Sequence, residues 1–271
     1  MNSRLQPGKR FLAGGFLLLA AGCASLPTSV PIQETEADQV RQEFKALLQE
    51  QRKCPAAVDA DVSVTVDNVL WSGTLSGYLR AMTPAYLRME GVNPLGLTEA
   101  ILAVDGENFM YLSVRNQEAY LGSLNAEKIA SFAPEGLVIA MNYYWLLGRI
   151  PPGDLGIAGI GLDANGQGHW LDVHYAATDE RAMVLFDARK HLVKRHLMLN
   201  ASEAIAADLS YEYSPATTVV DTCQLPSRIM ITKKGSGLIT LNFTKRYPTP
   251  ALDAAPFRIT PPAEYKRIVI Q

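Results

Sequence analysis

The feature that most constrains this chain is a long series of short segments in which apolar and polar residues alternate. In the first of them, residues 58–66, Val62, Val64 and Val66 alternate with polar residues. A period of two is typical of β-strands that bury one face. Turn sequences such as Asp105-Gly106 separate the segments and favour hairpins between them. The sequence therefore predicts a mainly β protein built as an antiparallel meander.

The other predicted strands share this alternation: residues 71–80, 86–92, 99–104, 108–113, 118–122, 168–176, 181–187, 192–199, 208–213, 225–233 and 238–246. No crossover helices alternate with these strands, so a parallel α/β sheet is not expected. No unit of roughly 20 to 50 residues repeats, which argues against a propeller or a solenoid.

Three segments have helical patterns instead. Residues 34–51 place apolar residues, among them Phe44 and Leu47, on one face of an amphipathic helix. Such a helix needs an apolar surface to pack on. Two shorter helices are predicted over residues 126–132 and 137–148, because a proline separates the two apolar runs.

The N-terminus has the order of charge and apolarity that is found in signal peptides. Three basic residues precede an apolar run over residues 11–21, which ends at Gly22-Cys23. About eleven apolar residues span roughly 16 Å as a helix, about half the hydrocarbon core of a bilayer. The run is therefore expected to be a signal peptide and not a membrane span.

Residues 19–23, Leu-Ala-Ala-Gly-Cys, resemble the bacterial lipobox, with the leucine one place earlier than in the commonest pattern. In that motif the cysteine is acylated and becomes the first residue of the mature protein, so the resemblance implies a lipid on Cys23. A plain secretory signal that is cut elsewhere is the alternative. Ala24 follows the cysteine in place of an aspartate. By resemblance to the sorting rule of enterobacteria, this favours the periplasmic face of the outer membrane.

The expected organisation is a signal peptide over residues 1–22, a lipidated tether over residues 23–33 and one β-rich domain over residues 34–271. The tether is rich in Ser, Thr and Pro, a composition typical of flexible linkers. Without residues 1–22 the chain has a formal net charge of about −5. This charge argues against nucleic acid as a partner and against a basic membrane-binding patch.

Cys54 and Cys223 are the cysteines that remain besides Cys23. In an exported protein such an even pair favours a disulfide. A bridge between them would close a loop of about 170 residues and stabilise the fold by roughly 5 kcal/mol on the loop-entropy scale. Two separately buried thiols are the alternative.

Three segments resemble the LolA/LolB lipoprotein-localisation superfamily, and most closely its outer-membrane member LolB. Residues 92–100, Val-Asn-Pro-Leu-Gly-Leu-Thr-Glu-Ala, resemble the Pro-Leu-Gly loop of LolB and the strand after it. Residues 144–151 resemble its Trp, Leu-Gly and Pro signature. Residues 257–262, with Ile268-Val269 after them, resemble the closing segment of LolA.

The resemblance implies a curved, incompletely closed antiparallel β-barrel that is lidded by helices and leaves an apolar cavity for acyl chains. The lid and cavity candidates are Phe44, Leu47, Trp145 and Leu146. The apolar faces could instead pack on one another without a void, which is the common outcome for such faces. The chain departs from the family in the extra length of residues 155–224, in its cysteine pair and in Arg149.

Pro94, Leu95 and Gly96 form the candidate membrane-transfer loop. A leucine in a turn between two strands is expected to be exposed, and an exposed leucine can enter the interfacial zone of a bilayer. In LolB the matching loop helps to deliver cargo, so the resemblance implies this role for Leu95. A buried turn leucine is the alternative. The implied partners are an acylated lipoprotein or lipid and a periplasmic LolA-like carrier.

The sequence offers no pattern for catalysis or for metal binding. His169 and His174, and likewise His191 and His196, are five residues apart, which places the members of each pair on opposite faces of a strand. No nucleophile elbow is present. We therefore expect neither an enzyme nor a cofactor or metal. Two functions remain: a carrier of acylated cargo, and a noncatalytic scaffold of an envelope assembly that uses the same fold.

Overall fold

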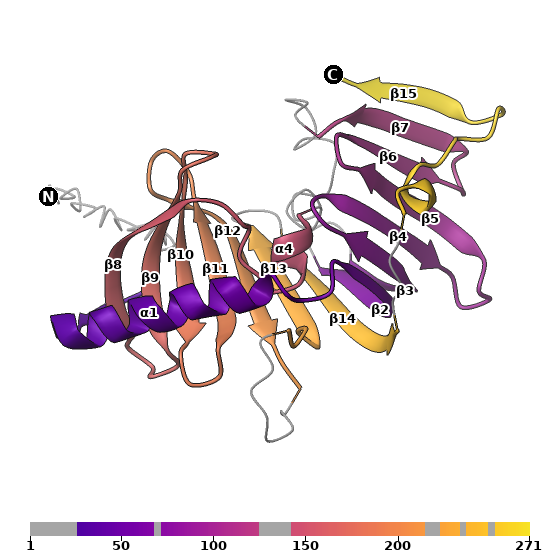
Figure 1. The fold of residues 1–271 in the computed structure, drawn as a ribbon. Coiled ribbons are helices and arrows are strands. Elements are labelled where there is room, and N and C mark those ends of the chain that lie inside the picture. The colour runs from indigo at the N-terminus through magenta and orange to yellow at the C-terminus, as the bar shows by residue number, and fades with distance from the viewer. Residues whose placement is uncertain (1–25, 68–71, 125–141, 215–222, 234–236, 249–252) are drawn as a thin grey trace, which may run out of the picture.

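The computed structural model describes residues 26–67, 72–124, 142–214, 223–233, 237–248 and 253–271. The strands of these residues form one 15-stranded sheet, which is open and curved, with few helices (Figure 1). In chain order the elements are β1 (Ser29–Pro31), α1 (Glu34–Gln51), β2 (Ala57–Asp67), β3 (Ser72–Met82), β4 (Tyr86–Val92), β5 (Thr98–Asp105), β6 (Asn108–Ser113), β7 (Glu118–Ser123), α4 (Tyr143–Leu146), β8 (Leu155–Asp163), β9 (His169–Tyr175), β10 (Glu180–Asp187), β11 (Leu192–Leu199), β12 (Ile205–Glu212), β13 (Arg228–Lys233), β14 (Gly237–Tyr247), η1 (Ala255–Phe257) and β15 (Lys266–Ile270).

The sheet consists of two meanders that join in the middle. Strands β8 to β14 lie in sequence order in one half, and β2 to β7 lie in sequence order in the other. The long strands β14 and β2 pair with each other and connect the halves (Figure 1). All neighbouring strands are antiparallel except β15, which pairs parallel to β7. The predicted antiparallel meander is confirmed, and the parallel edge strand is an addition to it.

Helix α1 packs on one face of the sheet, which we call the inner face. It lies along the half formed by β8 to β13 (Figure 1). Its buried residues are Ala37, Val40, Phe44 and Leu47. The ring of Phe44 meets that of Phe186 edge to face, with centroids 5.3 Å apart. Fully burying side chains of this size contributes about 1.5 to 3 kcal/mol each, so the predicted helix over residues 34–51 is held by its apolar face.

Helix α4 is shorter than the predicted helix over residues 137–148. The side chain of Asn142 accepts hydrogen bonds from the backbone N–H groups of Tyr144 and Trp145 and thereby starts the helix. Gly148, with a φ of 65°, follows its end, and a Cβ there would lie 2.5 Å from the hydroxyl of Tyr213. Only glycine fits this close, left-handed position. Residues 126–132 and 137–141 of the predicted helices lie outside the described residues.

The predicted strands agree with the structure to within three residues at each end, but β8 was not predicted. Its glycines, Gly156, Gly159 and Gly161, interrupt the apolar alternation. The prediction of a flexible tether was wrong for Ser29–Pro31, which forms β1 and pairs with β8. A Cβ on Gly161 would lie 2.9 Å from the Cβ of Ser29. The glycine therefore allows β1 to approach and extend the sheet.

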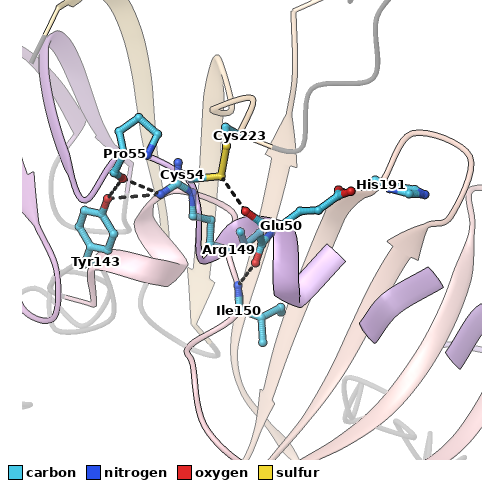
Figure 2. The surroundings of a disulfide bond; sticks show 9 residues. Glu50, Cys54, Pro55, Tyr143, Arg149, Ile150, His191 and Cys223 are labelled. Carbon is cyan, nitrogen blue, oxygen red and sulfur yellow. Dashed lines mark hydrogen bonds and ion pairs between the residues drawn. A yellow bond between two sulfur atoms is a disulfide. The ribbon is translucent and has the colours of Figure 1, made fainter. Parts of the chain in front are cut away.

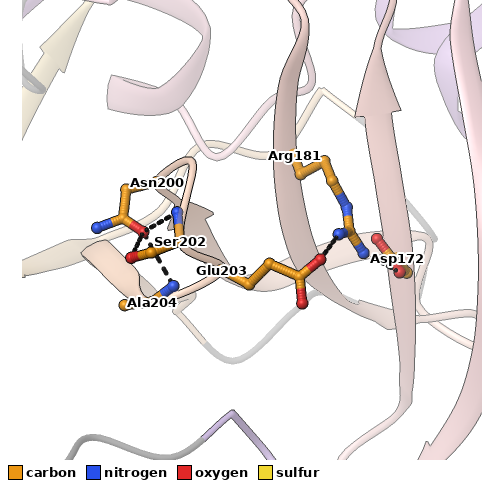
Figure 3. A network of polar contacts seen from close by, with 6 residues as sticks. All are labelled: Asp172, Arg181, Asn200, Ser202, Glu203 and Ala204. Atoms are coloured by element: carbon orange, nitrogen blue, oxygen red, sulfur yellow. Dashed lines mark hydrogen bonds and ion pairs between the residues drawn. The ribbon is translucent and has the colours of Figure 1, made fainter.

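The outer face, opposite α1, is held by polar contacts and by the C-terminal segment. Arg181 forms ion pairs with Asp172, at 2.8 Å, and with Glu203 (Figure 3). In the turn before β12, the side chain of Asn200 accepts hydrogen bonds from the N–H groups of Ser202 and Ala204 (Figure 3).

In the other half of the sheet, Phe257 of η1 packs against Tyr86 of β4, with ring centroids 5.4 Å apart. The C-terminal segment thus crosses the outer face before it adds β15.

Candidate functional site

The turn between β4 and β5 is held in one shape by Asn93. Its side-chain oxygen accepts hydrogen bonds from the backbone N–H groups of Leu95 and Leu97, both at 3.0 Å. The N–H of Gly96 donates to the carbonyl oxygen of Asn93 at 2.8 Å, and Gly96 has a φ of 78°. Asparagine and glycine are the residues that such turns favour. The turn is therefore locally fixed, and its side chains point in defined directions.

Two leucines of this turn are exposed. Leu95 is 84% exposed, the highest value among the large hydrophobic residues that the structure describes, and Leu97 is 62% exposed. The expectation that Leu95 stands exposed in its turn is confirmed. The sequence did not single out Leu97, because it lies between the candidate loop Pro94-Leu95-Gly96 and the predicted strand over residues 99–104. Its position, two residues after Leu95 in a turn, was the signal that could have identified it.

Behind the turn, the inner face of β2 to β5 is apolar and becomes lined by small residues toward the turn. Leu79, Leu87 and Leu102 are buried, and Met89 is partly buried. Nearer the turn, the register places Gly77 opposite Gly91, and Gly91 opposite Ala100. A Cβ on Gly91 would meet only ordinary contacts, the nearest being Leu75 Cδ1 at 3.5 Å. A methyl group on Gly91 would therefore fit at this end of the inner face.

The four lid and cavity candidates are brought together in one core. Phe44, Leu47, Trp145 and Leu146 are all buried and belong to the same hydrophobic cluster. Trp145 packs edge to face on His196, with ring centroids 5.6 Å apart. The side chains below α1 are therefore packed against one another, as in the alternative that the sequence left open. Helices α1 and α4 lie where the helical lid was expected. Phe44, Leu47, Trp145 and Leu146 belong to the packed core beneath them.

This core contains buried polar groups that the sequence did not indicate. His196 is fully buried, and its Nε2 lies 3.3 Å from the hydroxyl of Tyr175. Burial lowers the pKa of His196 to about 4 and raises the pKa of Tyr175. His196 Nδ1 and Trp145 Nε1 have no hydrogen-bond partner among the described residues. The side chains of His196 and Tyr175 are therefore neutral at pH 7, and His196 is a core residue.

The other histidines are each near an acidic side chain. His169 lies 3.2 Å from Glu36, His174 lies 2.8 Å from Asp179, and His191 lies 2.9 Å from Glu43. The contacts of His169 and His191 join α1 to the sheet. Within the part of the chain that the structure describes, no group of three or more His, Cys, Asp or Glu residues is placed to hold a metal ion.

The predicted disulfide between Cys54 and Cys223 is present (Figure 2). The two Cα atoms are 5.4 Å apart, and the residues are separated by 169 positions in the sequence. Cys54 follows the end of α1, and Cys223 precedes β13. The bridge therefore fixes the connection between α1 and β2 to the centre of the sheet.

The predicted lipid attachment site, Cys23, lies outside the described residues. Residues 1–25, with the predicted signal peptide and Cys23, are not described. Among the residues that are, no helix combines the length and the apolarity that a membrane span requires.

Comparisons with known proteins identify the fold. No protein-family model matches the sequence, and no curated protein matches it at a significant level. A LolA superfamily protein from Nitrosomonas europaea is 9% identical with a TM-score of 0.55, and the match covers 80% of this chain and 97% of that one. A DUF1329 family protein from Desulfovibrio piger is 10% identical with a TM-score of 0.55, covering 81% and 97%.

A third similar structure is a domain from Vibrio parahaemolyticus that is provisionally named an outer membrane lipoprotein-sorting protein. It is 11% identical with a TM-score of 0.54, and the match covers 81% of this chain and 94% of that domain. At these identities the likeness concerns the fold and does not single out LolB within the superfamily. The chain has the fold of the LolA superfamily.

Proposed function

We propose that this protein is a noncatalytic, lipid-anchored carrier that receives acyl chains of lipoproteins or lipids and delivers them to the outer membrane. The acyl chains lie on the inner face of β2 to β5, beside Gly91 and Met89. The turn with Leu95 and Leu97 contacts the bilayer during delivery. The lipid on Cys23 keeps the protein at the periplasmic face of that membrane, and a LolA-like carrier supplies the cargo.

The observation that carries this proposal is the pair of exposed leucines in a turn fixed by Asn93. Water contact of so much apolar surface is unfavourable, and each fully buried leucine contributes about 1.5 to 3 kcal/mol. Entering the interfacial zone of a bilayer removes this surface from water. Because the turn is already fixed, little conformational entropy is lost on insertion.

The fold supports the same class of function. The chain covers nearly the whole of three solved structures of this fold. One of them is provisionally named for the sorting of outer membrane lipoproteins.

Bound lipid tests the proposed acyl site. Lipids extracted without hydrolysis from the purified full-length chain should contain acyl chains, whereas the chains attached to Cys23 stay on the protein. Gly91→Phe should lower the amount of extracted lipid, since a large side chain would occupy the inner face, whereas Gly91→Ala should not. Mass spectrometry of the extracts measures both. Equal amounts of bound lipid in Gly91→Phe and the wild type would exclude this face as the acyl site.

The packed core below α1 favours a second function, a noncatalytic scaffold of an envelope assembly. In that case the inner face holds no ligand, and the same extracts contain no acyl chains. The two functions therefore predict opposite results in one measurement.

A further inference from the structure

Among the described residues, Arg149 is a buried cation without an acidic partner. It follows α4 and is 5% exposed. Its Nη1 donates hydrogen bonds to the carbonyl oxygen of Pro55 at 3.1 Å and to the hydroxyl of Tyr143 at 3.3 Å (Figure 2). Within the described residues, Nε and Nη2 donate to no protein acceptor. Both contacts of this guanidinium are therefore with neutral oxygens.

The described residues around Arg149 do not neutralise its charge. Glu50, near the end of α1, has its carboxylate 3.7 Å from His191 (Figure 2). The neighbouring phenols are neutral, because burial raises the pKa values of Tyr143 and Tyr213. Burial also lowers the pKa of Arg149. A buried charge without a counter-ion is unfavourable, and arginine stays protonated in proteins, so this site is incomplete without an anion.

Arg149 lines a pocket with a volume of about 200 Å³. The pocket is bounded by the end of α1, the residues between α1 and β2, Thr83 between β3 and β4, and the segment from α4 to the start of β8. The described residues that line it include Arg52, Ala56 and Arg149. Among them are two arginines and no aspartate or glutamate, so the pocket is positively charged and otherwise mostly apolar.

We propose that this pocket binds one anionic group, a carboxylate or a phosphate, through the guanidinium of Arg149. Nε and Nη2 lie on one edge of a guanidinium, and two parallel N–H donors on that edge match two oxygens of a carboxylate or a phosphate. The pocket is smaller than the roughly 300 to 1,000 Å³ of sites for drug-sized ligands. It therefore holds a small anion or the headgroup of a lipid, and not a whole lipid. Anion binding here does not require the acyl site or the leucine turn.

Calorimetric titration of the full-length chain tests this site, with inorganic phosphate and sodium butyrate as probes at constant ionic strength. The wild type should bind at least one probe with saturation. Arg149→Gln should weaken this binding by at least about tenfold, because charge-assisted bonds to arginine are lost. Lys53→Gln is the matched control: it removes a positive charge next to the pocket, from an exposed residue that does not line it.

A second variant keeps the test decisive if Arg149→Gln does not fold. Ala56 lines the pocket and is exposed, so Ala56→Phe should fill the pocket and abolish binding while the fold is retained. Short-chain phosphatidylglycerol below its micelle concentration distinguishes the sources of the anion. Binding at least about tenfold tighter than that of phosphate indicates a lipid headgroup, and equal binding indicates a free anion. Absence of binding to every probe, or equal binding by the wild type and Ala56→Phe, would overturn the site.

Discussion

The side-chain oxygen of Asn93 holds the backbone N–H of Leu95 at 3.0 Å, and this contact fixes the direction of the most exposed leucine in the described structure. Asn93→Ala removes this hydrogen bond and the one to Leu97. We expect a loss of about 1 to 2 kcal/mol in the free energy of unfolding, since each bond contributes roughly 1 kcal/mol net. Transfer of acylated cargo to liposomes should slow, because the loosened turn must be ordered on insertion.

Asn116→Ala provides the control, since Asn116 is an exposed residue in the turn between β6 and β7. Denaturant unfolding and a transfer assay on both variants check the prediction. If Asn93→Ala transfers cargo as fast as Asn116→Ala, a fixed turn is not needed.

The disulfide gives a second prediction. Replacing Cys54 and Cys223 by serine opens a loop of 169 residues, and the loop-entropy relation gives a loss of roughly 5 kcal/mol. Urea unfolding of the oxidised wild type and the double variant measures this difference. Thiol labelling of the native protein under nonreducing denaturation should find neither cysteine free, and full labelling of both would contradict the bridge.

The buried His196 makes stability depend on pH. Its pKa is lowered to about 4 by burial, whereas an unfolded histidine has a pKa of about 6.5. Below pH 6.5 the unfolded chain therefore takes up a proton that the folded chain does not. The contribution of neutral His196 to the free energy of unfolding is fully present above about pH 6.5. It is lost as the pH falls toward 4, by up to about 3 kcal/mol.

Urea unfolding of the wild type and of His196→Phe, compared at pH 7.5 and pH 4.5, isolates this contribution from those of other groups. The wild type should lose more stability than the variant over this range. Equal losses in the two proteins would show that His196 is not buried in the neutral form.

Cys23 gives a prediction about anchoring. Cys23→Ser should remove the acylated residue, so the protein should no longer fractionate with outer membranes, because a run of about eleven apolar residues is too short for a stable span. Membrane fractionation with an outer-membrane marker measures this. A variant that partitions like the wild type would show that another feature localises the protein.

Most strands could be predicted because their signal is local. In β2, Val58, Val62 and Val64 alternate with polar residues and face the core. In β8, by contrast, Gly156, Gly159 and Gly161 remove the apolar signal. The edge strands β1 and β15 were not predicted as strands because they form through pairing with distant segments, β8 and β7.

The candidate site was predicted only where one local segment or the number of cysteines determines it. The exposure of Leu95 follows from the chemistry of its turn. The pairing of Cys54 with Cys223 follows from the cysteine count. The burial of His196 was not predicted, because β11 has buried side chains on both faces, and Leu197 next to it belongs to a second cluster. The pocket at Arg149 depends on segments far apart in the sequence that meet only in the folded chain.

Leu95→Glu tests the role of the turn most directly, because Leu95 is 84% exposed. Surface substitutions usually change stability by less than about 0.5 kcal/mol, so the melting temperature should hardly change. Transfer of acylated cargo to liposomes should be abolished, since a carboxylate opposes insertion into the bilayer. Val269→Glu is the control, because Val269 is 67% exposed but lies on the edge strand β15.

The decisive measurement is liposome transfer by the wild type, Leu95→Glu and Val269→Glu, with thermal unfolding of the same three proteins. Delivery through the turn predicts equal melting temperatures, transfer by the wild type and Val269→Glu, and none by Leu95→Glu. Transfer by Leu95→Glu at the rate of the wild type would contradict it.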